Sequence, residues 1–191
     1  MILMLAAAVL ALPRGAVARS SEDEVAAATS YAQSVGIPME EAARRLYMQE
    51  HAQAQVSRIV DRYSGRLAGA YWEDMPTLQF VIRLKGSAPV TPVPNVETAR
   101  GELPIVIKMG APATIDELWE KIKRHHADLY ETVPGLQGIF VDERTGDIVL
   151  HVYSETLDRR DYSSRIPALR RKLDAPVRIE FLSGPMRNSL E

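Results

Sequence analysis

Apolar residues recur in this chain at two spacings, and the change between them divides it into helices and short strands. Helical spacing runs through residues 38–63 and 115–129, where apolar side chains return every three or four positions. Runs rich in β-branched and aromatic residues lie at 67–84 and 136–152, each interrupted by a polar turn, as expected of β-hairpins. The pattern predicts the order helix, hairpin, strand, then helix, hairpin, helix, strand.

The two predicted hairpins share a sequence plan. Leu67-Ala68-Gly69 opens the first and Leu136-Gln137-Gly138 the second, and each is followed by large residues, an acidic turn and another apolar run. We therefore predict an α+β fold built from a duplicated unit, in which a long helix covers a small three-stranded antiparallel or mixed sheet. One such unit has a small core, so each is expected to need the other, or a partner, for stability.

Breaks in the pattern give the expected boundaries. Gly36-Ile37-Pro38 separates a short Ala-rich helix over Val25–Val35 from the first long helix. Residues 86–101 hold several prolines and predict a loop, followed by a strand over Leu103–Met109. We expect a mobile segment and short helix at 19–37, a first α+β unit at 38–110 and a second at 111–191.

The second half begins with a clear helix signal. Thr114-Ile115-Asp116-Glu117 is a capping box, and the helix it opens is expected to bury Trp119 together with Ile115, Leu118, Ile122 and Leu129. Ser163 or Ser164 is expected to cap a later helix that carries Pro167 in its first turn. Val177–Leu182 then alternates apolar and charged residues, which predicts a strand with one face in water.

The N-terminus predicts export. Met1–Leu12 is an apolar run too short to span a bilayer, and Ala16-Val17-Ala18 suits signal peptidase. We expect a signal peptide over residues 1–18 and a periplasmic or extracellular protein. No Lys or Arg precedes the apolar run, and the alternative is a disordered apolar tail.

Composition narrows the function classes. The 191 residues carry a net charge of -2, and no basic cluster is interleaved with aromatic residues, so nothing points to nucleic acid. The chain has no cysteine, which removes disulfides, thiolate metal sites and thiol nucleophiles.

The histidines offer little chemistry. His125 and His126 are adjacent on a helix and point about 100° apart, unlike an i, i+4 pair of metal ligands. His51 lies on the first long helix, and His151 is expected to face away from the core of its strand. We interpret all four as surface residues and expect no metal.

Other candidate residues are also better explained without catalysis. No Gly-x-Ser-x-Gly elbow and no Gly-rich phosphate loop occurs, and Ser183-Gly184 is expected to be a turn at a strand end. Asp142, Glu143 and Asp147 suit a solvated turn better than a Ca²⁺ loop. Tyr71-Trp72 and Trp119 are more typical of a core than of a ligand platform. We expect a protein without catalytic residues or cofactor; a hydrolase acting through His151 or Asp142 remains a distant alternative.

Four segments, taken in order, carry a resemblance: Tyr31–Ile37, Arg66–Trp72, Val133–Leu136 and Asp142–Leu150. Their motifs are short, and their order and spacing over residues 25–186 resemble the pro-region of the α-lytic protease and streptogrisin family of secreted chymotrypsin-like serine proteases. In that family an aromatic stands where this chain has Leu67.

The resemblance implies a C-shaped pro-domain that acts as an intramolecular chaperone and as an inhibitor of its protease. The family's last sheet extends a protease hairpin, and its tail lies in the active-site cleft. Carried over, the partner-binding residues are the last strand and the start of the tail: Val177, Arg178, Ile179, Glu180, Phe181, Leu182, Ser183, Gly184, Pro185 and Met186. An alternating edge strand followed by a Gly-Pro break is physically suited to strand addition.

Where the family has a protease, this sequence stops at Glu191. A protease partner is therefore expected either in trans or in a longer precursor of which this is a fragment. The alternative is an exported envelope binding module that reuses the fold without a protease.

Overall fold

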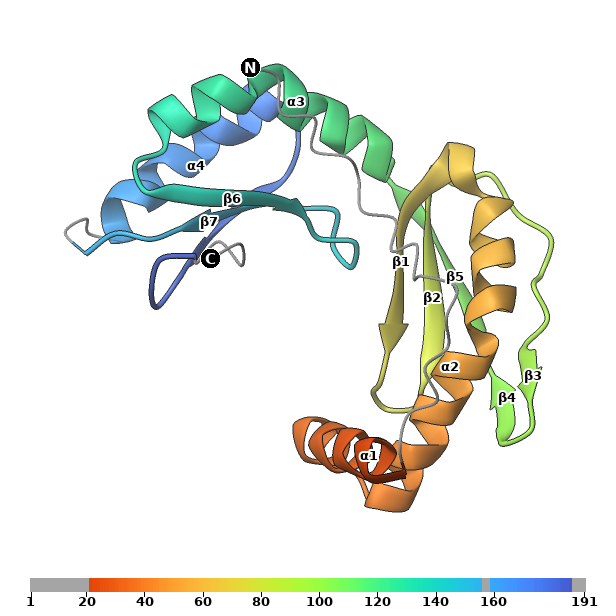
Figure 1. Ribbon diagram of the computed structural model, residues 1–191. Coiled ribbons are helices and arrows are strands. Elements are labelled where there is room, and N and C mark those ends of the chain that lie inside the picture. Colours follow the sequence, from red (N-terminus) through yellow and green to blue (C-terminus); the bar gives the residue numbers. More distant parts are fainter. Residues whose placement is uncertain (1–20, 156–158, 187–191) are drawn as a thin grey trace, which may run out of the picture. The chain divides into compact units, whose positions relative to one another are not determined.

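The computed structural model describes residues 21–155 and 159–186 (Figure 1). The expected signal peptide lies outside the described residues. The chain divides between Tyr47 and Met48, within one helix, into two compact units, each described by itself below.

The first unit contains helix α1 (Ser21–Val35) and the start of helix α2 (Met39–Asp61). Residues 21–24, expected to precede the short helix, form its first turn and place three acids at its positive end. Gly36 ends α1 with φ at 75°, a conformation that favours glycine, and its amide donates to the Ala32 carbonyl at 2.9 Å.

The second unit opens with the remainder of α2 and a three-stranded sheet. Strand β1 (Leu67–Glu73) pairs antiparallel with β2 (Gln79–Lys85), and β2 pairs parallel with β5 (Ile105–Ala111). Between α2 and β1 lies the short 3₁₀ helix η1 (Ser64–Arg66). One face of the sheet and the apolar stripe of α2 share a core that includes Met48, Ala52, Val56, Ile59, Phe80, Ile82 and Leu84. The first predicted helix, hairpin and strand are thus confirmed.

The connection between β2 and β5 contains two short strands that its proline content did not predict. Residues expected to form a loop include β3 (Val96–Thr98), which pairs with β4 (Gly101–Leu103) as a small antiparallel hairpin. Val96 and Leu103 are fully buried in the core of the first sheet, which explains why this excursion is ordered. The following strand begins at Ile105, two residues later than expected.

Helix α3 (Ile115–Thr132) begins at the predicted capping box. The Glu117 amide donates to Thr114 Oγ1 at 3.1 Å, and the Thr114 amide donates to the Glu117 carboxylate at 2.9 Å. Leu118, Ile122 and Leu129 are buried as predicted, but Trp119 is exposed, so its assignment to the core was wrong.

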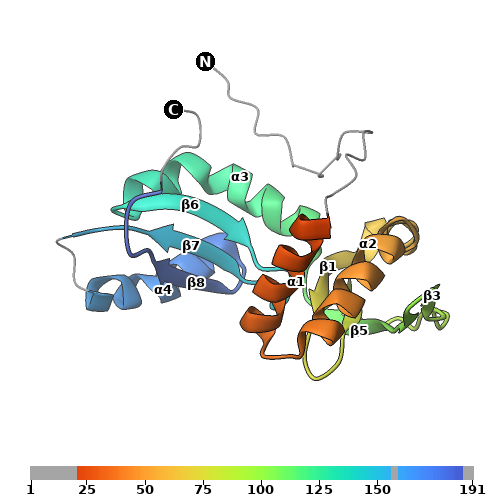
Figure 2. The ribbon, with the colours of Figure 1, turned by 60° about the horizontal axis from the view of Figure 1, so that its bottom comes forward.

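The second sheet contains β6 (Leu136–Val141), β7 (Ile148–Val152) and β8 (Val177–Phe181). Strands β6 and β7 are antiparallel, and β8 is parallel to β7 at the sheet edge. Helix α3 and helix α4 (Arg159–Leu173) cover one face, where Tyr162 and the apolar side chains of the three strands form a core (Figure 2). Helix α4 starts before Ser163 and carries Pro167 in its interior, so the predicted cap and first-turn position were wrong.

The two three-stranded sheets repeat one plan. In each, a long helix precedes an antiparallel hairpin, and a third strand returns parallel to the second strand of that hairpin. The two Leu-x-Gly motifs occupy the same place, because the strand register shifts between Leu67 and Gly69 and again between Leu136 and Gly138. The predicted α+β fold with a duplicated unit is confirmed. None of the described helices is both long and apolar enough to cross a membrane.

Candidate functional site

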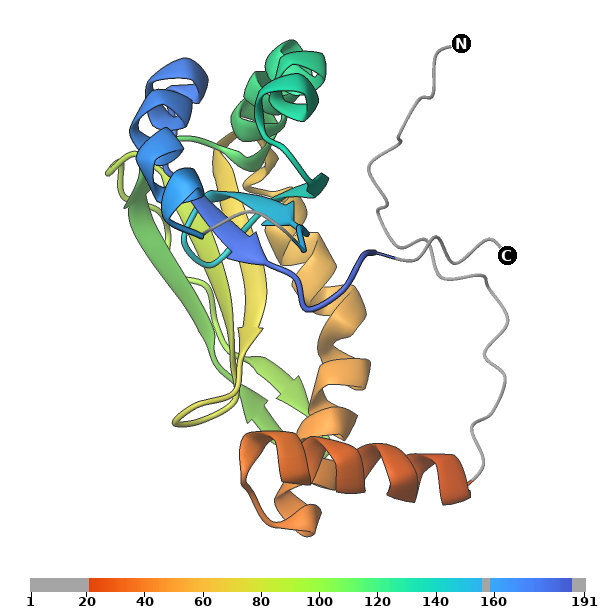
Figure 3. The same ribbon diagram turned by 90° about the vertical axis from the view of Figure 1, so that its left-hand side faces the viewer.

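The ten residues predicted to bind a partner form the free side of the second sheet and its continuation. Val177–Phe181 is β8, the edge strand beyond β7. The Leu182 amide donates to the Val152 carbonyl at 2.9 Å and ends the ladder. Ser183–Met186 then continues without regular structure (Figure 3). Ser183, Pro185 and Met186 are exposed.

The hydrogen-bond pattern shows which backbone groups of β8 point away from the sheet. The Ile148 amide donates to the Pro176 carbonyl, and the Leu182 amide donates to the Val152 carbonyl. The backbone amides and carbonyls of the even-numbered residues of β8 therefore point toward β7. The backbone groups of Val177, Ile179 and Phe181 consequently face outward. Arg170 of α4 already donates to the Val177 carbonyl at 3.2 Å. Ile179 therefore lies at the centre of the edge available to another strand.

The side chains of β8 point alternately to the two faces of the sheet. Val177, Ile179 and Phe181 pack in the core beneath the helices. Arg178 and Glu180 lie on the opposite face, where Arg178 contacts Asp142 Oδ2 at 2.7 Å and Asp147 Oδ2 at 3.2 Å. The alternation of wet and dry faces predicted for this strand is confirmed.

Charge pairing sets the ionisation of this cluster. Burial raises the pKa of Asp142, but hydrogen bonds from Arg178, the Arg144 amide and Thr145 outweigh it, so the pKa lies below its ordinary value. The pKa of Arg178 is raised, chiefly by its hydrogen bond to Asp142. Arg178 and Asp142 therefore both stay charged at neutral pH, and their ion pair fixes β8 to the β6–β7 turn.

His151 faces away from the core as predicted. Its Nε2 lies 3.0 Å from the Glu180 carboxylate, and its ring packs on Phe140 with the ring centroids 4.5 Å apart. His126 of α3 packs in a similar way on Tyr130, at 4.9 Å. The partners of His151 are thus a carboxylate and an aromatic ring. Within residues 21–155 and 159–186, no cluster of side chains suits a metal ion.

The acidic turn of the second hairpin is closed by its own backbone and side chains. The Gly146 amide donates to the Asp142 carbonyl at 2.7 Å, and the Arg144 amide donates to Asp142 Oδ1 at 2.8 Å. The Asp147 amide donates to Thr145 Oγ1 at 3.2 Å. Turn chemistry explains these residues.

The same turn is not simply solvated, and here the sequence interpretation was wrong. The Ala70 amide on β1 donates to Glu143 Oε2 at 2.8 Å. Arg83 on β2 donates to the carbonyls of Glu143 at 3.0 Å and Thr145 at 2.9 Å. The turn Asp142–Asp147 therefore docks on the outer face and edge of the first sheet.

An aromatic residue completes the docking. The Arg144 guanidinium lies over the Tyr71 ring at 4.5 Å and donates to the Trp72 carbonyl at 2.6 Å. Trp72 itself faces the core, with Phe80 edge-on at 4.9 Å, as predicted for a core aromatic. Hydrophobic periodicity could not have identified Arg83 or Arg144 as residues of this contact, because it does not report on charged surface residues. The signal in the sequence was the repeated Leu-x-Gly motif, whose first glycine, Gly69, lies under the docked turn.

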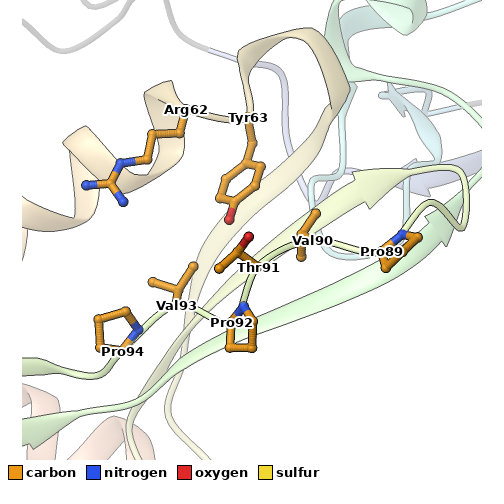
Figure 4. A pocket seen from close by; sticks show the side chains of 8 residues that line it. All are labelled: Arg62, Tyr63, Pro89, Val90, Thr91, Pro92, Val93 and Pro94. Atoms are coloured by element: carbon orange, nitrogen blue, oxygen red, sulfur yellow. The ribbon is translucent and has the colours of Figure 1, made fainter.

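A shallow pocket lies apart from these residues, between the end of α2 and the proline-rich segment (Figure 4). Its volume is about 440 Å³, and Arg62, Tyr63 and residues 89–94 line it. Tyr63 points toward the proline-rich segment, whereas Arg62 lies at the rim (Figure 4). The lining offers hydrophobic contacts and one cation but no acid–base pair.

No protein-family model matches this chain, and no curated protein matches it in sequence.

Proposed function

We propose that this chain is a non-catalytic, pro-domain-like partner of a secreted chymotrypsin-like serine protease. It assists folding of the protease, inhibits it, or does both. The edge strand β8 pairs with a protease strand, and the segment from Ser183 onward enters the active-site cleft. The protease is supplied in trans or by a longer precursor. The chain is exported, and it needs neither cofactor nor catalytic residue.

The observation that carries the proposal is the position of β8. It is an edge strand whose side chains are held on both faces, by the core and by the ion pairs of Arg178. Its outward backbone groups are therefore preorganised for another strand, which lowers the entropy that pairing must overcome. Arg170 of α4 already donates to the outward carbonyl of Val177, at the start of the strand. A partner strand can therefore pair with the open stretch centred on Ile179.

The function requires a rigid surface rather than a reactive site. Extracellular proteases persist because they unfold slowly, and the same high barrier slows their folding. A partner that binds the folding transition state lowers that barrier, and binding of the native protease as well makes it an inhibitor. The two small sheets, fixed by the docked turn, suit such a surface.

A proline at Ile179 tests strand addition. Proline removes the outward amide, and edge strands accept proline where the amide faces solvent. Ile179→Ala is the matched control, because it loses more core packing but keeps the amide. We expect Ile179→Pro to weaken inhibition of the protease about fivefold or more, the value of one backbone hydrogen bond plus a steric clash. Ile179→Ala should stay close to the wild type, after correction for its folded fraction by circular dichroism.

The protease used is α-lytic protease, with a streptogrisin as a second probe. Equal losses in the two Ile179 variants would show that packing, not pairing, matters. Inhibition that survives in Ile179→Pro refutes strand addition. Deletion of 183–191 should weaken inhibition, because it removes the segment that the proposal places in the cleft. Unchanged inhibition after that deletion refutes the placement of the tail in the cleft.

The alternative, an exported envelope binding module, makes a different prediction. Such a protein would sediment with cell-wall polymer or an envelope protein and would leave both proteases active. The gene downstream of the last codon gives an independent check, since an in-phase or adjacent protease reading frame favours the pro-domain function.

A further inference from the structure

The shallow pocket at the end of α2 continues into a second pocket of about 380 Å³. The two pockets adjoin, because Arg62, Val93 and Pro94 line both of them. We call the two pockets together the α2 groove. One wall of the groove is α2, and the other is the proline-rich segment at residues 89–94 (Figure 4).

The helical wall presents one face of α2. Its residues follow the spacing i, i+3, i+4 and i+7 of a single helix face: Gln55, Arg58, Ile59 and Arg62. Ile59 is buried, and both arginines are exposed. Tyr63 follows this face and points toward Thr91 in the opposite wall (Figure 4). The helical wall is therefore mainly cationic.

The proline-rich wall is apolar and is held in place along its length. Arg66 donates to the Ala88 carbonyl at 3.0 Å before the segment, and Val96 is buried in the core of the first sheet after it. Val90 and Val93 are half-buried and pack against the same core. Because proline also restricts the backbone, this wall keeps its shape without a ligand, and binding to it costs little ordering entropy.

The positive charges of the helical wall are not neutralised. Arg58 Nε donates to the Ala54 carbonyl at 3.1 Å, but within residues 21–155 and 159–186 no ion pair joins Arg58 or Arg62 to an acid. Asp61 lies between the two arginines in sequence, yet no acidic residue of the described chain lines either pocket. The groove is therefore complementary to a negatively charged ligand.

The spacing of the two arginines fits an extended peptide. Arg58 and Arg62 are one helical turn apart, which corresponds to about 6 Å along the axis. Side chains two residues apart in an extended chain lie on the same side at about 6.6–6.8 Å, and the side chain between them points the other way. Two acids at alternate positions can thus reach both arginines while the residue between them faces Val93 and Pro94.

We propose that the α2 groove binds an extended segment of a partner protein in which acidic and apolar residues alternate. The carboxylates pair with Arg58 and Arg62, and the apolar side chain between them packs on Val93 and Pro94. This proposal does not rest on the protease function, since residues 177–186 line neither pocket.

The capped peptide Glu-Leu-Glu-Leu-Glu tests the site directly. In ¹H–¹⁵N spectra of the full chain, this peptide at millimolar concentration should shift the amides of Gln55, Arg58, Arg62, Tyr63 and Val93. Glu-Glu-Leu-Leu-Glu is the matched control, because it has the same composition but no two glutamates at alternate positions. Lys-Leu-Lys-Leu-Lys reverses the charge. Shifts confined to other residues, or equal effects of the first peptide and either control, overturn the proposal.

Neutral variants of the two arginines test the charge. Arg58→Gln and Arg62→Gln should each weaken binding of the alternating peptide about threefold, and the double variant about tenfold, as expected for two exposed ion pairs. Glutamine is a good helix former, so the variants should keep the wild-type fold. Arg124→Gln, the same change at an exposed position of α3, is the control and should bind as the wild type does. Equal losses in all three single variants would show nonspecific attraction and contradict the proposal.

Other occupants of the groove would give different results. Octanoate is a small carboxylate with an apolar body, and if it shifts the same amides as strongly as the peptide, the groove binds small amphiphiles and the proposal is wrong. If the same amides shift on dilution of the protein alone, the occupant is a second copy of this chain, which also overturns it. Binding of the alternating peptide in a chain that inhibits neither protease would support the groove and leave only the protease function refuted.

Discussion

Replacement of Gly69 by alanine should separate the turn Asp142–Asp147 from the first sheet. An added Cβ overlaps the backbone carbonyl of Glu143, and backbone cannot rotate aside as a side chain can. The turn must therefore move outward by the radius of a methyl group. Gly138→Ala is the natural control, since the atoms nearest the equivalent Cβ belong to the Phe140 ring and the Met186 sulphur, which are side-chain ends and can move aside.

The expected magnitude follows from the contacts that the turn makes. Its displacement breaks hydrogen bonds from the Ala70 amide, from Arg83 and from Arg144, together with the contact of Arg144 with the Tyr71 ring. A net hydrogen bond contributes about 1 kcal/mol and an exposed cation–π contact about 0.5 kcal/mol. These groups lie at the surface, where water replaces part of what is lost, so we expect a loss of about 2–3 kcal/mol in the free energy of unfolding. For a chain of this size that lowers the Tm by roughly 5–10 °C.

Thermal unfolding followed by circular dichroism measures the effect, and limited trypsin digestion localises it, because release of the turn exposes the bond after Arg144. We expect Gly138→Ala to unfold within a degree or two of the wild type. A Glu143→Ala change should add little to Gly69→Ala, since both act through the same contact. Equal Tm values for the two glycine variants, or full additivity with Glu143→Ala, would refute the docking.

Two further predictions concern the helices. Thr114→Ala removes the α3 cap and should lower the free energy of unfolding, measured in urea, by about 1 kcal/mol. Thr132→Ala is the control and should cost little, because it loses only a hydroxyl bonded to the Asp128 carbonyl. Equal losses in the two variants would show that the cap does not stabilise the helix. Hydrogen bonding to Arg44 lowers the pKa of Glu41 from 4.5 to about 2. Because the pKa is lower in the folded state, this stabilisation is complete above about pH 4.5 and is lost as the pH falls toward 2. The difference in stability between the wild type and Glu41→Gln should shrink over that interval, and a pH-independent difference would contradict the assignment.

Local signals in the sequence predicted much of the fold. The capping box at Thr114 and Glu117 fixes the start of α3, because two reciprocal hydrogen bonds form within four residues. The alternation of Val177–Leu182 predicted an edge strand with two different faces, since strand side chains alternate whatever their surroundings. The repeated Leu-x-Gly motif predicted two copies of one hairpin, and the register shifts of β1 and β6 explain why a glycine recurs there.

The sequence-based predictions were wrong where the structure depends on packing between residues far apart in the chain. Trp119 lies next to the buried Leu118 on α3 but is exposed, and no local pattern shows how far the buried face of a helix extends. The proline-rich connection holds β3 and β4 because Val96 and Leu103 find a core more than ten residues away in the chain. Pro167 lies inside α4, where burial of Tyr162, Leu169 and Leu173 outweighs one missing backbone hydrogen bond.

The sequence alone determined the α+β class, the duplication and the position of the edge strand, since these depend on periodicity and on breaks between neighbouring residues. The tertiary structure decided what the acidic turn does. Glu143, Arg144 and Arg83 look like ordinary surface charges in sequence, and their contacts span 60 residues or more. Only folding brings the glycine of one repeat against the turn of the other.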